Sequence, residues 1–228
     1  MRMGRKRILG PAGIMALTLA GLSMASAQAA RTAAAKGATL SYQRVFKGSS
    51  PELIQVKVYE DSDGATCEIR QLDEDPGASP FTVSAPLRAK MFALAAELNH
   101  FAGADLDVKR KLANLGEKKF RWERGTEAHE TTFNYTLNAA ANQLMQIFEG
   151  LARQQEDFMT LGRRMKYDRL GVNDALLDIE FDLSRNLLPE PQHLLPLLDQ
   201  IVNDSHFVEV ARERARALAT QIRRAKQN

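Results

Sequence analysis

Hydrophobic and polar residues alternate with a period of two in several short segments of the first 137 residues, a pattern typical of strands with one buried face. The first such segment ends before the turn sequence KGSSP. It predicts a strand whose alternating positions are Leu40, Tyr42, Arg44 and Phe46. Helical spacing dominates after residue 137, so the chain divides into a strand-rich front half and a helical back half.

A hairpin is predicted next, because LIQVKVYED and ATCEIRQL flank the turn sequence Asp63-Gly64. Asp-Gly favours a two-residue turn with positive φ at both central positions. The register that follows pairs Val58 with Ile69 and Glu60 with Cys67. The polar face of this hairpin, which includes Tyr59 and Arg70, is a candidate binding surface.

Ser84 is placed to cap a helix, and Pro86 falls in the first turn, where proline does little harm. Apolar residues follow at helical spacing and form one stripe: Leu87, Met91, Leu94, Ala95, Leu98 and Phe101. We expect this helix to pack on the apolar face of the sheet.

The stretch KFRWERGTEAHETTFNY predicts a second hairpin, with a two-residue turn at Gly125-Thr126. This turn sets two pairs of opposite charge and one aromatic pair across the strands, each contributing roughly 0.2–1 kcal/mol. The charged pairs are Arg124 with Glu127 and Arg121 with Glu130, and the aromatic pair is Trp122 with His129. The same register places Phe120 opposite Thr131.

Asn138 can cap a long helix in which apolar residues recur every seven positions, at Leu144, Leu151, Phe158 and Met165. This seam is either intramolecular or the contact of a homodimer, so Leu144, Leu151 and Phe158 are candidate interaction residues. Further helices are predicted from Asn173 to Leu187, over residues 194–202 and after Ser205. The expected fold class is α+β: an antiparallel sheet of hairpins packed on one helix over residues 39–137, then an α-helical region over 138–228.

The first 29 residues have the pattern of a cleaved secretory signal. A cationic start precedes an apolar run, and ASAQAA offers cleavage after Ala27 or Ala29. A membrane anchor is the alternative, although glycine and proline dilute a run that would need about 20 predominantly apolar residues to span a bilayer. We expect an exported protein, periplasmic or extracellular, in which residues 30–38 form a flexible leader.

Signal removal changes the charge of the chain. Residues 1–29 hold four of the 31 Lys and Arg and none of the 28 Asp and Glu, so the mature chain has 27 bases against 28 acids. The mature chain therefore lacks the positive charge typical of nucleic-acid-binding proteins. DNA binding through the C-terminal arginines is accordingly the least supported of the functions that the sequence suggests. Cys67, the only cysteine, is interpreted as a buried hydrophobe or, alternatively, an intermolecular link.

The sequence has no recognisable motif for a metal, a cofactor or a catalytic nucleophile. Its histidines stand singly, without the spacing of metal ligands, at His100, His129, His193 and His206. It also lacks a nucleophile elbow and a glycine-rich phosphate loop. The helical stripe Asp174, Asp178 and Asp182 is interpreted as a solvated face. We therefore predict no cofactor and no metal.

The front half resembles an uncharacterised family of exported bacterial α+β domains of unknown function. The residues that carry the resemblance are SYQRVFKGSSPELIQVKVYEDSDGATCEIR and VSAPLRAKMFALAAELNHF. Cysteines often found in that family's first turn are absent, and Ser49 and Ser50 occupy the turn instead. The resemblance implies an exported α+β domain and transfers no site residue.

Two functions remain open. The first is a non-catalytic binding or interaction module in the cell envelope, with a protein partner or a homodimer, no nucleic acid and no membrane span after signal cleavage. The second is a hydrolase-like enzyme in which His129, beside Trp122, works with Asp105 or Asp107 from the loop 102–111 as an acid–base pair. The alternative for His129 is that it covers Trp122 at the rim of the sheet.

Overall fold

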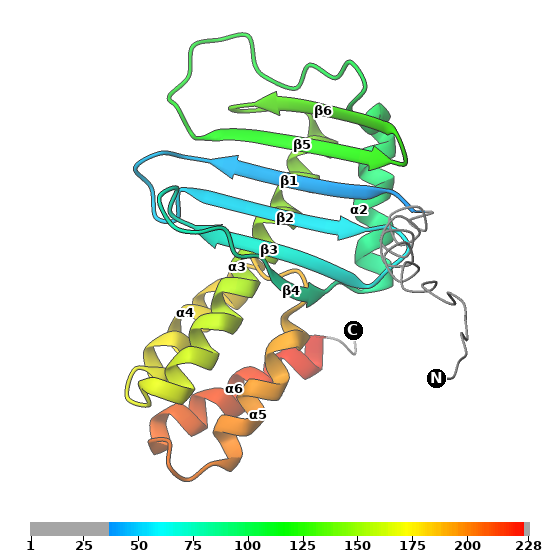
Figure 1. Cartoon of the computed structure of the whole chain (residues 1–228). Helices are drawn as coiled ribbons and strands as arrows, with labels where there is room; N and C mark the ends of the chain where they lie inside the picture. Colours follow the sequence, from blue (N-terminus) through cyan, green and yellow to red (C-terminus); the bar gives the residue numbers. More distant parts are fainter. Residues whose placement is uncertain (1–36, 226–228) are drawn as a thin grey trace, which may run out of the picture. The chain divides into compact units, whose positions relative to one another are not determined.

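The computed structural model describes residues 37–225 and has an α+β fold (Figure 1). Within these residues lies a six-stranded antiparallel sheet of order β4-β3-β2-β1-β5-β6. The strands are β1 (Thr39–Val45), β2 (Leu53–Tyr59), β3 (Gly64–Arg70), β4 (Ser79–Thr82), β5 (Glu117–Arg124) and β6 (Glu127–Phe133). The predicted signal peptide, its cleavage site and most of the leader lie outside the described residues.

Two helices, α2 and α3, lie against the same face of the sheet (Figure 1). The helices are α2 (Ala85–Glu97), α3 (Ala139–Tyr167), α4 (Val172–Ser184), α5 (Leu195–Asn203) and α6 (Glu209–Ala225), with short 3₁₀ turns η1 (Asn99–Phe101) and η2 (Pro191–Leu194). The predicted caps are confirmed: Ser84 accepts a hydrogen bond from the Leu87 amide, and Asn138 accepts one from the Ala141 amide. The sequence predicted one helix on the sheet, and the first half of α3 is a second.

The β5–β6 hairpin has the predicted register. Arg124 lies opposite Glu127, and Trp122 lies opposite His129. Gly125 has a φ of 61°, which the two-residue turn requires and which glycine adopts without strain. The Arg121 guanidinium lies 2.8 Å from the Glu130 carboxylate, so the predicted cross-strand ion pair forms.

The predicted register of the β2–β3 hairpin is wrong. Val58 pairs with Ala65 rather than Ile69, and Cys67 pairs with Val56 rather than Glu60. The turn is centred on Asp61-Ser62, where the Ser62 hydroxyl accepts a hydrogen bond from the Gly64 amide. The shift moves each partner by four residues and keeps every side chain on its predicted face, so hydrophobic alternation could not distinguish the two registers.

Strand β4 was not predicted. Its segment, SPFT, follows a proline- and glycine-containing sequence and itself contains Pro80, and such residues favour a loop. Pro80 is tolerated because β4 is an edge strand, which leaves one side of its backbone without a partner strand.

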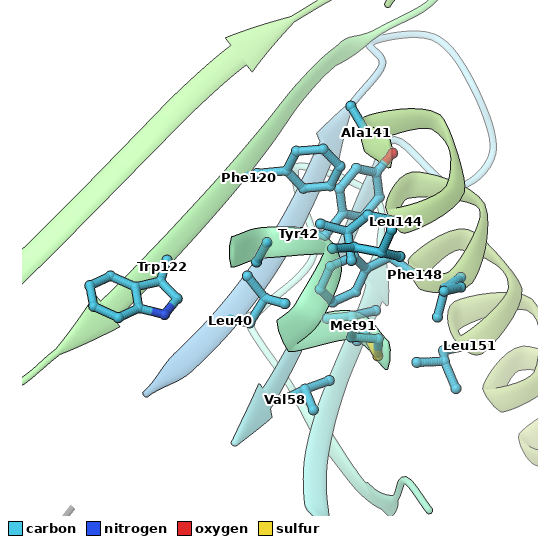
Figure 2. Packing of buried hydrophobic residues seen from close by; sticks show 14 of the residues in the cluster. Leu40, Tyr42, Val58, Met91, Phe120, Trp122, Ala141, Leu144, Phe148 and Leu151 are labelled. Atoms are coloured by element: carbon cyan, nitrogen blue, oxygen red, sulfur yellow. The ribbon is translucent and has the colours of Figure 1, made fainter. Parts of the chain in front are cut away.

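The first hydrophobic core lies between the sheet and the helices α2 and α3 (Figure 2). Its centre is aromatic: the Tyr42 ring stacks on Phe148 with centroids 5.5 Å apart, and Phe120 lies 5.6 Å from Tyr42. Leu144 and Leu151 have no exposed surface in this core. These two members of the heptad seam therefore pack inside the chain and cannot form a dimer contact, whereas Phe158 is 36% exposed.

A second core joins the end of α3 to α4, α5 and α6. It begins with Leu161 on α3 and extends to Ile222 on α6, whereas the last α3 residue of the first core is Ala152. Helix α3 begins at Ala139, one residue after the expected boundary, and its packing changes from the first core to the second in the middle of the helix. Ala38, expected in the leader, is 1% exposed and bonded to Glu60.

Candidate functional site

One stripe of α3 lines two adjoining concave sites, which we call together the α3 groove. The upper part, of about 620 Å³, lies between α2, α3 and the segment after α4. The lower part, of about 410 Å³, lies between α3 and α4. Arg153 lines both parts. The stripe consists of Gln143, Gln146, Gly150, Arg153, Asp157 and Thr160, which recur at helical spacing.

The groove takes its shape from a close approach of the chain to α3. A Cβ atom at Gly150 would lie 2.7 Å from the Leu187 carbonyl oxygen and 2.8 Å from the Pro189 ring, so only glycine fits there without a shift. The adjoining segment is also bonded to α3, because the Glu190 amide donates to the side chain of Gln154 at 2.9 Å. The Glu190 carboxylate in turn accepts from the Ser84 amide at the start of α2.

The lower part of the groove is acidic. Four carboxyl groups and one guanidinium group line it, from Glu156, Asp157, Asp178, Asp182 and Arg153. The Asp182 side chain is only 6% exposed and accepts from the Arg153 guanidinium at 3.3 Å. The predicted solvated stripe is therefore correct for Asp174 and Asp178 and wrong for Asp182, because α3 covers it.

Asp157 is the most perturbed carboxyl group of the groove. Burial raises its pKa to about 7, and the negative charge of Asp182 adds to this effect while Arg153 opposes it. Its Oδ2 atom is inaccessible to solvent and has no hydrogen-bond partner among the described residues. A nearby cation would favour the ionised form of this group.

The upper part of the groove offers amide and basic groups. Its polar lining comprises Lys90, Gln143, Gln146, Glu149, Arg153, Arg185 and Asn186. Glu149 is held in place because the Tyr42 hydroxyl donates to its carboxylate at 2.7 Å and Arg44 lies 3.5 Å away. The groove therefore changes along α3 from a mixed polar surface to an acidic one.

His129 lies beside Trp122, with ring centroids 5.9 Å apart and planes nearly parallel. His100 lies on the same indole, 4.6 Å away, from a turn in which Asn99, His100 and Phe101 all have positive φ. The Glu127 carboxylate lies 3.6 Å from the His129 Nε2 atom. His129 lines neither part of the α3 groove.

Asp105 and Asp107 make contacts that do not involve His129. Asp105 pairs with Lys109. Asp107 accepts hydrogen bonds from the amides of Asn134 and Tyr135, which hold its pKa below the usual range. Asn134 follows His129 by five residues of extended chain, roughly 17 Å at about 3.4 Å per residue. The structure thus anchors Asp107 at the far end of β6.

The remaining interaction candidates lie on the polar face of the sheet. Tyr59 is 38% exposed at the end of β2. Arg70 is occupied, because its guanidinium donates to Glu68 at 2.7 Å and to the carbonyls of Gln71 and Glu74. This face is open and polar, but the two candidates do not enclose a concave site.

The sequence did not predict the α3 groove, because the residues of the groove come from four separate segments of the chain. Asp157 lies within the helix of the heptad seam. The one local sign that it is partly buried is its position directly before the seam residue Phe158. No group of three or more His, Cys, Asp or Glu in residues 37–225 is arranged to hold a metal ion. Within the same residues, none of the helices has both the length and the apolar composition needed to cross a membrane.

Comparisons with known proteins found no matching family model, no matching curated protein and no matching solved structure. The resemblance to an exported α+β family stays a prediction.

Proposed function

We propose that this chain is an exported, non-catalytic binding module of the cell envelope, which holds an extended segment of a partner protein in the α3 groove. A Lys or Arg side chain of the partner occupies the lower part. The observation that carries the proposal is the partly buried carboxyl group of Asp157, which lines a concave site and has an oxygen without a hydrogen-bond partner.

Charge selects the occupant of the lower part. With all groups ionised, its four carboxylates exceed its single guanidinium by three charges. Arg153 is already engaged with Asp182, so it does not neutralise Asp157 by a direct ion pair. An ammonium or guanidinium group of a ligand relieves the repulsion between Asp157 and Asp182, whereas an anionic ligand would increase it.

The upper part suits the backbone of the same segment. The side-chain amides of Gln143, Gln146 and Asn186 supply both donors and acceptors, as peptide N–H and C=O groups require. Ile147 and Leu87 provide apolar contact in the same concave site. A peptide therefore matches the groove along its length better than a small cation does.

A pair of labelled peptides tests the proposal. The sequence Gly-Ser-Gly-Lys-Gly-Ser-Gly and its Nε-acetyl-lysine counterpart differ only in charge, and fluorescence anisotropy measures both affinities. We expect the lysine peptide to bind more tightly, and its affinity to rise about tenfold from pH 6 to pH 8. A carboxyl group with a pKa near 7 is roughly 10% ionised at the first pH and 90% at the second.

Asp157→Asn should remove this pH dependence, because it keeps the volume of the side chain and loses its charge. Asp174→Asn is the matched control, since Asp174 is an exposed aspartate of α4 outside the groove. Equal binding of the two peptides, or an unchanged pH profile in Asp157→Asn, would contradict the proposal.

The alternative function is a hydrolase-like enzyme centred on His129. One observation favours it: two imidazoles, from His100 and His129, lie against Trp122 beside a turn with unusual backbone angles. His129→Ala tests it once a substrate is known, and full activity of that variant would end this alternative.

A further inference from the structure

The corner between α3 and α4 presents the two most exposed large hydrophobic side chains of residues 37–225. Tyr167 is 74% exposed and Leu170 is 79% exposed. Residues 166–170 are all exposed in one uninterrupted run. Single exposed apolar residues are ordinary, whereas contiguous exposed apolar residues are typical of interaction surfaces.

The corner is held rigidly by the second core. Met165 and Val172, on either side of the exposed run, are both buried there, with exposures of 8% and 0%. The Arg169 guanidinium lies 5.9 Å from the ring centroid of Phe207, which ties the corner to the segment before α6. Val208, next to that ring, adds a further exposed apolar side chain.

Basic side chains surround these apolar residues. Residues 163–170, RRMKYDRL, contain four bases and one acid. The acid, Asp168, is paired with Arg164 at 2.7 Å. The other three bases, Arg163, Lys166 and Arg169, form no ion pair among the described residues. The nearby acids Asp204 and Glu209 already have His206 and Arg212 as their partners.

We propose that this corner, residues 163–170, docks on the surface of an anionic phospholipid bilayer. Tyr and Leu are suited to the boundary between headgroups and acyl chains, and long basic side chains reach outward to the phosphates. Lys166 already lies over the Tyr167 ring, 5.0 Å from its centroid, so charge and apolar surface are presented together. The inference is independent of the α3 groove and of its ligand.

Sedimentation with lipid vesicles tests this proposal. The mature chain, from which residues 1–29 have been removed, should bind vesicles of phosphatidylcholine mixed with phosphatidylglycerol and should not bind vesicles of phosphatidylcholine alone. Binding should weaken as salt is added, because the attraction is screened. Lys166→Gln/Arg169→Gln should weaken partitioning about 30-fold. Each base near an anionic surface contributes about 1 kcal/mol, and each change of about 1.4 kcal/mol is tenfold in affinity.

Two matched variants separate this corner from general charge and hydrophobicity. Arg110→Gln/Lys111→Gln removes two exposed bases from a different loop, and Leu137→Ser removes an apolar side chain that is 67% exposed before α3. Both should bind as the unmodified chain does, whereas Tyr167→Ser/Leu170→Ser should lose binding. All four positions of the corner variants are exposed, so unchanged melting curves are expected and checked.

Three outcomes would overturn the proposal. The first is no binding to the anionic vesicles. The second is an equal loss of binding in the Arg110→Gln/Lys111→Gln control. The third is self-association of the chain, seen by light scattering and abolished by Leu170→Ser, which would assign the corner to a second copy of this chain instead.

Discussion

Asp157→Asn should make the protein more stable than the unmodified chain at alkaline pH, and the difference should shrink toward acid pH. The pKa of Asp157 is raised from an ordinary value of 3.8 to about 7 by burial and by Asp182. The folded state therefore binds a proton that the unfolded state has lost between these two values. Stability supplied by this proton is complete below pH 4 and is lost as the pH rises through 7.

The magnitude follows from the interval between the two pKa values. Each pH unit in this interval lowers the free energy of unfolding by about 1.4 kcal/mol, so the whole interval corresponds to a loss of about 4 kcal/mol. About 2–3 kcal/mol of this loss occurs from pH 5 to pH 8. Asp157 retains some contact with solvent, which reduces the effect, so we expect about 1–2 kcal/mol in that range. Asparagine resembles the protonated carboxyl group in shape and has no such dependence.

Urea unfolding at pH 5 and pH 8 measures the effect. The free energy of unfolding of the unmodified chain should fall relative to that of Asp157→Asn as the pH rises. Asp174→Asn, which changes an exposed carboxyl group of α4, should have the same pH dependence as the unmodified chain. Parallel pH profiles for Asp157→Asn and the unmodified chain would refute the reasoning that Asp157 is destabilised by burial and by Asp182.

Two further predictions concern buried positions. Gly150→Ala should lower the free energy of unfolding by about 1–3 kcal/mol, because the new Cβ would lie 2.7 Å from the backbone oxygen of Leu187. Thermal melts measure the effect. A higher melting temperature, as alanine produces at an open helical position, would contradict the close approach. Cys67 should react with a thiol reagent only after unfolding, since burial raises the pKa of its thiol to about 12. Absorbance follows the reaction, and fast labelling of the folded chain would contradict the burial of Cys67.

The sequence predicted the fold class because its local signals agree with one another. In the β5–β6 hairpin, the alternation, the charge pairs and the turn at Gly125 all favour one register, and that register is present. The β2–β3 hairpin lacked this redundancy. Registers that differ by four residues bury the same side chains, and the Asp63-Gly64 signal favoured the incorrect one.

The candidate site was beyond the reach of local patterns. Asp157 and Asp182 are 25 positions apart in the chain, and both were consistent with exposed faces of amphipathic helices. Whether a carboxyl group is buried depends on which helix covers it, which is set by the packing of α4 on α3 and by the missing side chain at Gly150. For His129 the sequence correctly predicted the cross-strand neighbour Trp122, because strand register is a local signal. The expected partners Asp105 and Asp107 bond elsewhere, because strand register does not set the path of their loop.

The change of core within α3 leaves a short span of this helix outside both hydrophobic cores. The helix is clamped by the sheet up to Ala152 and by the C-terminal helices from Leu161, and between them only Gln154 is buried. This span of α3 carries Arg153 and Asp157, two of the α3 residues whose charges line the lower groove. A ligand of the lower groove would therefore contact the part of α3 that neither core covers, and would link it to α4.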